Sequence, residues 1–128
     1  MDADLLALFD RLVEDKGYPN RSEAIRDLVR AALVEREWQA GGHEVAGAIT
    51  LVYNHHHPVG EHLRDLQHQH HQLIVSTMHI HLDADHCLEV LVVKGPGQDL
   101  RRLADRLIGG KGVKHGHLTL ATTSRNLP

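Results

Sequence analysis

Residues 74–94, IVSTMHIHLDADHCLEVLVVK, decide how this chain folds. Two alternating runs rich in Val, Ile and Leu flank the polar segment 83–85, a pattern typical of two strands joined by a short turn. We expect a β-hairpin with a three-residue loop. That loop would pair Leu82 with His86, His81 with Cys87 and His79 with Glu89.

This register decides which side chains share a face of the hairpin. Side chains two residues apart on a strand point to the same side, so both histidines would lie with Cys87. A slip of one residue would bury Cys87 beside Met78 instead. We expect the opposite, apolar side to face the core, with Met78, Ile80, Leu82, Leu88, Val90 and Val92.

Outward from the hairpin, the remaining periodicity predicts an α+β protein whose C-terminal part has the order βαββαβ. This is the order of a ferredoxin-like fold, in which two helices cover one face of a four-stranded sheet. Val75, Leu91 and Val93 would leave the second face partly apolar, which favours burial against another subunit. The predicted strands are 43–53, 73–82, 86–94 and 112–121, and the predicted helices are 58–71 and 98–108.

The first 40 residues predict two amphipathic helices. The first runs from Asp4 to a stop at Gly17, and the second begins at Asn20, with Glu23 as its capping-box partner. Gly41-Gly42 then indicates a hinge. We therefore expect two modules, residues 1–38 and 43–128.

The composition favours a small cytoplasmic protein that does not cross a membrane. Hydrophobic residues make up 41% of the 128 residues and aromatic residues only 3%, and no apolar run is long enough to span a bilayer. The single cysteine excludes an internal disulfide and suits a reducing compartment. The net charge of −3 gives no overall attraction to nucleic acid, so any DNA contact would be local.

The most unusual feature is the 13 histidines, which indicate metal binding or a pH-sensitive surface. His79, His81 and Cys87 supply two imidazoles and a thiolate, one ligand short of four-coordination. His68 at the end of the preceding helix is the preferred fourth ligand, with His70 and His71 as competitors. Planar ligation by these donors would suit Ni(II) or Cu(II), and tetrahedral ligation Zn(II).

Other candidate residues carry weaker signals. We interpret the triplet of His55, His56 and His57 as a solvated loop, whereas His115 and His117 share a strand face and could hold a secondary ion. Glu89 would either orient a ligand histidine or act as an ordinary cross-strand partner.

An enzyme with Cys87 as nucleophile and His79 or His81 as base is disfavoured. The pattern around Cys87 predicts no strand-to-helix elbow that would present its thiol. We therefore expect no catalytic function.

Three motifs in order resemble the NikR family of nickel-responsive regulators: residues 17–27 (GYPNRSEAIRD), His79-Ile80-His81 with Cys87, and residues 112–118 (GVKHGHL). The resemblance runs from about Asp2 to Leu120. It implies an N-terminal ribbon-helix-helix, an ACT-like C-terminal domain and a homotetramer built as a dimer of dimers.

The resemblance also implies a function. One Ni(II) per subunit would be held by His79, His81 and Cys87, with His68 coming from a neighbouring subunit. Nickel would act as corepressor of a gene for nickel uptake. A second, weaker cation site would use Glu23 and Asp27, although Glu23 also suits the helix cap and Asp27 could pair with Arg26 or Arg30.

The expected DNA contact departs from the family. Family members read the major groove with a short basic strand ahead of the first helix, and this sequence starts where that strand would end. We favour an upstream start codon or a strand missing from this chain over a loss of DNA recognition. Binding to operator DNA is expected only if the native protein has that strand.

What remains for DNA is a set of phosphate contacts from Arg21, Ser22 and Arg26. Residues 1–38 hold 6 Lys or Arg against 9 Asp or Glu, a net charge of −3, so nonspecific affinity for DNA should be poor. The alternative is a nickel-binding storage or chaperone protein that does not bind DNA.

Overall fold

The computed structural model describes residues 1–56, 59–125 and 127–128. By its internal contacts the chain divides into two compact units, Met1–Leu33 and Val34–Pro128. The expected boundaries at 38 and 43 remain a prediction. The elements are α1 (Ala3–Asp15), α2 (Arg21–Ala40), β1 (Glu44–Asn54), α3 (Val59–Gln69), a 3-10 turn (His71–Leu73), β2 (Ile74–His81), β3 (His86–Pro96), α4 (Gly97–Ile108) and β4 (Val113–Leu120).

Side-chain caps start both helices of the first unit. The Asp2 carboxylate accepts a hydrogen bond of 2.9 Å from the backbone N–H of Leu5 at the start of α1. Asn20 does the same for the N–H of Glu23 in α2, also at 2.9 Å, which confirms the predicted N-cap. The Glu23 carboxylate, expected to reach back to Asn20, pairs with Arg26 one turn along the helix.

The helix pair leaves most of its apolar side chains exposed within one chain. Among the described residues of this unit only Ala24 is buried. A helix pair that exposes this much apolar surface suits association with a second copy. The exposed residues are Leu5, Leu8, Leu12, Ile25, Leu28, Val29 and Leu33.

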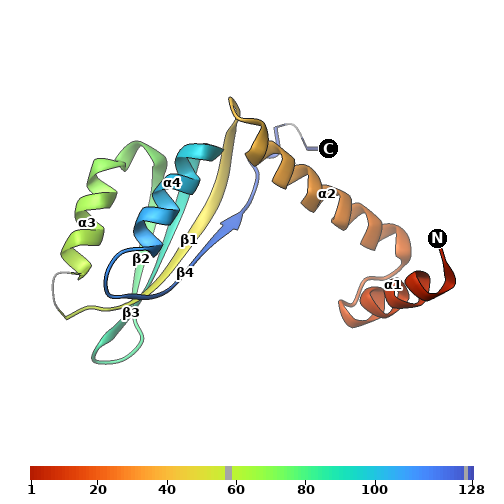
Figure 1. Ribbon diagram of the computed structural model, residues 1–128, viewed down its shortest axis with the longest axis horizontal. Coiled ribbons are helices and arrows are strands. Elements are labelled where there is room, and N and C mark those ends of the chain that lie inside the picture. The colour runs from red at the N-terminus through yellow and green to blue at the C-terminus, as the bar shows by residue number, and fades with distance from the viewer. Residues whose placement is uncertain (57–58, 126) are drawn as a thin grey trace. The chain divides into compact units, whose positions relative to one another are not determined.

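The second unit is a four-stranded sheet covered on one face by α3 and α4 (Figure 1). The strand order is β2-β3-β1-β4, and all three neighbouring pairs are antiparallel. This confirms the predicted α+β class and the ferredoxin-like βαββαβ order. None of the helices in the described residues combines the length and apolar character needed to cross a membrane.

The hairpin register is as predicted. His81 pairs with Cys87, and His79 pairs with Glu89. Asp83 fixes the turn, because its carboxylate accepts hydrogen bonds from the backbone N–H groups of Asp85 and His86 at 2.8 and 2.9 Å.

The expected orientation of the hairpin is wrong. Cys87 is buried on the helix-covered face, while Met78 and Ile80 are 59% and 39% exposed on the other side. The reason lies in β1, whose bulky residues Leu51 and Tyr53 pair with Glu89 and Cys87 and so fix that row as the core face. We call the uncovered side the open face; its exposed apolar residues are Met78, Ile80, Leu82 and Val92.

The core lies between this sheet and the two helices. It is built mainly from aliphatic side chains, as the composition predicts. The fully buried members include Val45, Ile49, Leu51, Leu63, Leu91, Val93, Leu100, Leu103 and Leu107.

Trp38 joins the last turn of α2 to this core. Its side chain is 1% exposed, and its indole N–H donates a hydrogen bond of 3.0 Å to the Ala121 carbonyl. A Cβ at Gly47 would approach the ring to 3.0 Å, so a glycine is required beneath it. The helix therefore continues to Ala40, past the point where the sequence pattern breaks.

We predict that Trp38→Ala lowers the free energy of unfolding by about 3–5 kcal/mol, the usual cost of truncating a buried tryptophan. Trp38→Phe should cost less, because it keeps most of the packing. Urea denaturation followed by circular dichroism measures both. Gln39→Ala, an exposed neighbour on α2, is the control. An unchanged stability of Trp38→Ala would contradict this anchoring role.

Candidate metal centre

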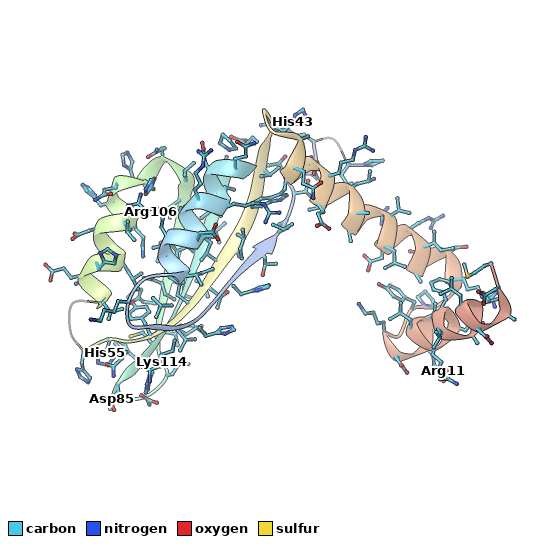
Figure 2. The ribbon with its side chains drawn as sticks, viewed as in Figure 1. Arg11, His43, His55, Asp85, Arg106 and Lys114 are labelled. Carbon is cyan, nitrogen blue, oxygen red and sulfur yellow. The ribbon has the colours of Figure 1, made fainter. Side chains whose placement is uncertain are left out.

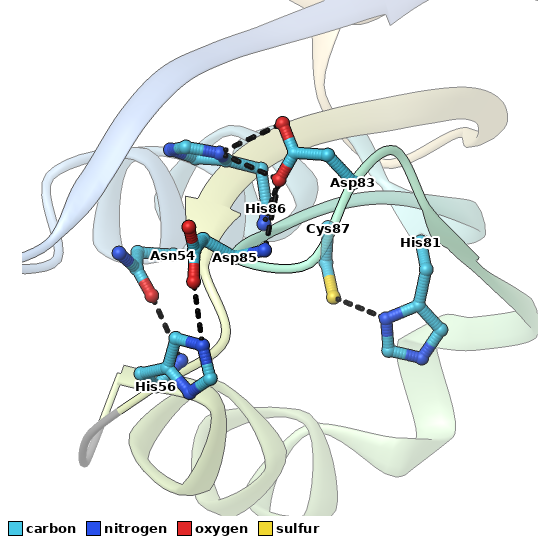
Figure 3. A network of polar contacts seen from close by, with 7 residues as sticks. All are labelled: Asn54, His56, His81, Asp83, Asp85, His86 and Cys87. Carbon is cyan, nitrogen blue, oxygen red and sulfur yellow. Dashed lines mark hydrogen bonds and ion pairs between the residues drawn. The ribbon is translucent and has the colours of Figure 1, made fainter.

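His81 and Cys87 form the centre of the candidate site. They are cross-strand partners on β2 and β3, and the Cys87 Sγ lies 3.5 Å from the His81 Nδ1 (Figure 3). Cys87 is 1% exposed, whereas His81 is exposed. The structure therefore brings a buried thiol and a solvent-accessible imidazole together.

His79 lies beside this pair but is held by other groups. Its Nε2 contacts the Glu89 carboxylate and lies 3.2 Å from the Tyr53 hydroxyl. An ionised carboxylate only accepts, so in this contact the Nε2–H of His79 donates to Glu89, and the contact orients the ring. Of the two alternatives for Glu89, this contact favours the one in which Glu89 orients a candidate ligand.

Glu89 also links this histidine to a helix. It is 1% exposed, and its second oxygen accepts a hydrogen bond of 2.9 Å from the Gln67 amide on α3. A buried carboxylate is costly unless its lone pairs are satisfied, and here each oxygen has a donor. The position of β2 is therefore coupled to that of α3.

A hollow of about 520 Å³ opens in front of these residues. β2 contributes His79 and His81, β3 contributes Cys87, and α3 contributes Glu61 and Arg64. Donor atoms of three elements thus face one space that an ion can enter.

His55 belongs to this site although its sequence pattern did not predict it. It follows β1 and lines the same hollow, so the solvated-loop interpretation is wrong for it. Its Nδ1 is buried and, among the described residues, has no hydrogen-bond partner. The pairing of β1 with β3 could have revealed it, because Tyr53 pairs with Cys87 and His55, two residues after Tyr53, lies on the same face if the strand direction continues.

The rest of the triplet has other surroundings. His57 lies outside the described residues. His56 is exposed and its Nε2 lies 2.8 Å from the Asp85 carboxylate, while the His55 backbone N–H donates to the Asp85 carbonyl at 2.9 Å. The hairpin turn therefore holds the connection after β1, and Figures 2 and 3 show the two segments side by side.

Burial raises the pKa of the Cys87 thiol, and the negative charges of Glu89 and Asp83 raise it further. Burial likewise raises the pKa of Tyr53 to about 12, with contributions from Glu89 and Cys87. Without a cation the sulfur therefore keeps its proton at neutral pH, and a metal ion must displace it.

His68 is not brought to the thiol of its own subunit. It lines a second hollow with Asp65, His71 and Ile74. The His71 Nδ1 lies 3.1 Å from the His68 carbonyl oxygen, and the third candidate, His70, contacts Arg106 on α4 at 3.1 Å.

The candidate residues of the first unit are engaged in exposed polar pairs. Asp27 accepts a hydrogen bond from the Tyr18 hydroxyl, which raises the pKa of Tyr18. Arg21 makes two hydrogen bonds of 2.8 Å to Asp10, which lower the pKa of that carboxyl. Glu23 and Arg26 pair with each other.

His115 and His117 lie on β4, opposite Val52 and Thr50 of β1. These two β1 residues pair with Leu88 and Val90, on the open face. Both histidines are exposed there, away from the hollow that contains Cys87.

The donor set fits a borderline or soft divalent ion. Imidazole nitrogen and thiolate sulfur suit Ni, Cu and Zn rather than Mg or Ca. The buried His55 Nδ1, which has no hydrogen-bond partner in the described part of the chain, is a polar atom that such an ion would satisfy.

Comparison with known proteins agrees with this chemistry. The profile of the NikR C-terminal nickel-binding domain matches residues 46–121, and that of the ribbon-helix-helix proteins of the CopG family matches residues 1–36. The chain belongs to the NikR family. This is a family of nickel-responsive transcriptional regulators and not of enzymes, which confirms the expectation for the class of protein.

Relatives of this NikR chain extend over almost its whole length. A Geobacter sp. M21 protein named as a nickel-responsive regulator is 59% identical, covering 99% of this chain and 92% of the relative. Similarly named proteins of Geobacter sulfurreducens and Nitratidesulfovibrio vulgaris are 54% and 52% identical, with the same coverage. An uncharacterised Thermotoga maritima protein of 15% identity shares the fold, with a TM-score of 0.58 over 62% of this chain and 100% of that one.

We predict that alkylation of Cys87 in the metal-free NikR chain has a midpoint above the pH of an ordinary thiol, about 8.5. Glu89→Gln should lower the midpoint, because it removes a negative charge that disfavours the thiolate. The pH dependence of the iodoacetamide reaction measures this, since the chain has one cysteine.

Glu61→Gln is the control for this experiment. It removes a carboxylate that lines the same hollow but does not act on the thiol pKa. A midpoint at or below that of a free thiol would contradict the burial argument.

Proposed function

We propose that this protein is a nickel-dependent repressor that controls nickel uptake, with Ni(II) as corepressor. The observation that carries the proposal is the cross-strand pair of His81 and Cys87 in a solvent-accessible hollow. A thiolate beside imidazoles binds Ni(II) more strongly than the hard cations of the cytoplasm. Membership of a nickel-responsive family supports the choice of metal.

The proposed ligands are His79, His81 and Cys87 of one subunit and His68 of a neighbouring subunit, with one Ni(II) per subunit. The separate hollow of His68 supports this arrangement, because that side chain does not face the thiol of its own chain. A ligand from a neighbour would make metal binding depend on assembly.

The proposed assembly is a homotetramer, a dimer of dimers. Two apolar surfaces of the single chain support it: the exposed side of the helix pair in the first unit and the open face in the second. Two distinct self-associating surfaces are what a dimer of dimers requires.

Coupling between metal and helix would pass through Glu89. This buried carboxylate contacts His79 on one side and Gln67 of α3 on the other. Because α3 also carries His68, ligation at either histidine would order the same helix. Nickel would then favour one of two arrangements of the DNA-binding dimers.

Operator contact would use Arg21, Ser22 and Arg26 on the phosphates. Arg21 and Arg26 have carboxylate partners, but exposed ion pairs contribute about 0–1 kcal/mol and a phosphate can replace them. The proposed second cation site at Glu23 and Asp27 would likewise require each carboxylate to leave its present partner.

A second candidate is a nickel store or chaperone that does not bind DNA. The net charge of −3 over residues 1–38 favours it, together with the pairing of both arginines to carboxylates. The two candidates share the metal site and differ only in what the first unit does.

We predict that nickel raises the affinity for the operator by about 5- to 150-fold, the range of typical allosteric couplings, in the native protein that carries the basic strand expected ahead of α1. Genomic fragments captured with Ni²⁺ and with EDTA should differ, and the enriched ones should precede genes for nickel transport. Cys87→Ala and His68→Ala should lose the difference.

The control variant is His62→Ala, an exposed histidine of α3 that lines neither hollow. Equal capture with nickel and with EDTA would contradict the corepressor. If the nickel-loaded protein captures no DNA fragment, the result would favour the second candidate, a nickel store or chaperone.

A further inference from the structure

Three donor residues of a single subunit converge without any contribution from a neighbour. The ligand atoms of His55, His81 and Cys87 all lie within 4.8 Å of one another. The imidazole rings meet edge to face, with centroids 5.2 Å apart, and the thiol lies 3.5 Å from the His81 Nδ1. These residues come from the segment after β1, from β2 and from β3.

His55 is held in place for this role. Its backbone N–H donates to the Asp85 carbonyl, and its neighbour His56 contacts the Asp85 carboxylate. The His55 Nδ1 is nevertheless buried with no partner among the described residues, which is costly for a polar atom. A fixed imidazole with an unsatisfied buried nitrogen is preorganised to bind a cation.

His79 is not part of this group. Its Nε2 faces Glu89 and Tyr53, both on the core side of the sheet. The thiol therefore has ligand atoms of two imidazoles, those of His55 and His81, within 4.8 Å. This set differs by one residue from the proposed nickel ligands of the same subunit.

We propose that His55, His81 and Cys87 of one subunit form an entry position for the metal, from which the ion passes to the set containing His79 and a neighbour's His68. The identity of the ion as Ni²⁺ rests on the proposed function, whereas the donor set itself suits any borderline divalent cation. The two positions share His81 and Cys87. They are therefore mutually exclusive, and the two positions of one subunit together hold one ion at a time.

The test measures the nickel binding that remains when the neighbour's proposed ligand, His68, is removed. In His68→Ala, Ni²⁺ titration should still produce the near-ultraviolet absorption of a thiolate-ligated nickel. In the double variant His68→Ala/His55→Ala the nickel affinity should be at least about tenfold lower than in His68→Ala, which is the smallest loss expected when a ligand or a group that supports it is removed. Calorimetry on the full chain gives the affinities.

The matched control is His68→Ala/His56→Ala, which removes the adjacent exposed histidine and should keep the affinity of His68→Ala. Melting temperatures in EDTA show whether each variant folds, and His55→Gln replaces His55→Ala if that variant does not. Equal affinities with and without His55 would overturn the proposal.

Failure of the proposed function gives a different result. If the nickel-loaded wild type captures no DNA, but replacing His55 still weakens nickel binding in the His68→Ala background, the repressor function is wrong and the entry position stands. If nickel promotes DNA capture, but replacing His55 leaves the nickel affinity unchanged, the entry position is wrong and the repressor function stands.

Discussion

The antiparallel pairing of β2 with β3 is the constraint on which the site depends. Because side chains alternate across a sheet, a shift of one residue would place Cys87 on the opposite face from His81. Asp83 holds the turn that sets this register, through hydrogen bonds to two backbone N–H groups. The turn therefore determines the register, and the register determines whether the candidate ligands lie on one face of the sheet.

Much of this arrangement could be predicted from the sequence. The alternating pattern and the short polar turn fix the strands and the cross-strand pairs, and hydrophobic periodicity fixes the helices. The face of the hairpin could not be predicted from the hairpin alone, because both sides of it carry apolar residues. The bulky row of β1, which includes Leu51 and Tyr53, makes that choice through a pairing distant in sequence.

The same long-range pairing explains the missed histidine. In sequence His55 looks like one of three loop histidines, and only the pairing of Tyr53 with Cys87, two residues earlier, places it near the thiol. Trp38 is a similar case, since its contacts with Ala121 and Gly47 extend a helix beyond its sequence pattern. In both cases the local signal was weak and tertiary contacts determined the structure.

We propose above all that the hollow in front of β2 and β3 binds nickel through the thiolate of Cys87, the single cysteine of the chain. Anomalous diffraction at the nickel edge, from crystals of the nickel-loaded full chain, tests it directly. We expect a peak within bonding distance of the Cys87 Sγ and a His81 ring nitrogen. A peak only at exposed histidines such as His115 and His117, with the sulfur remote from the ion, would contradict it.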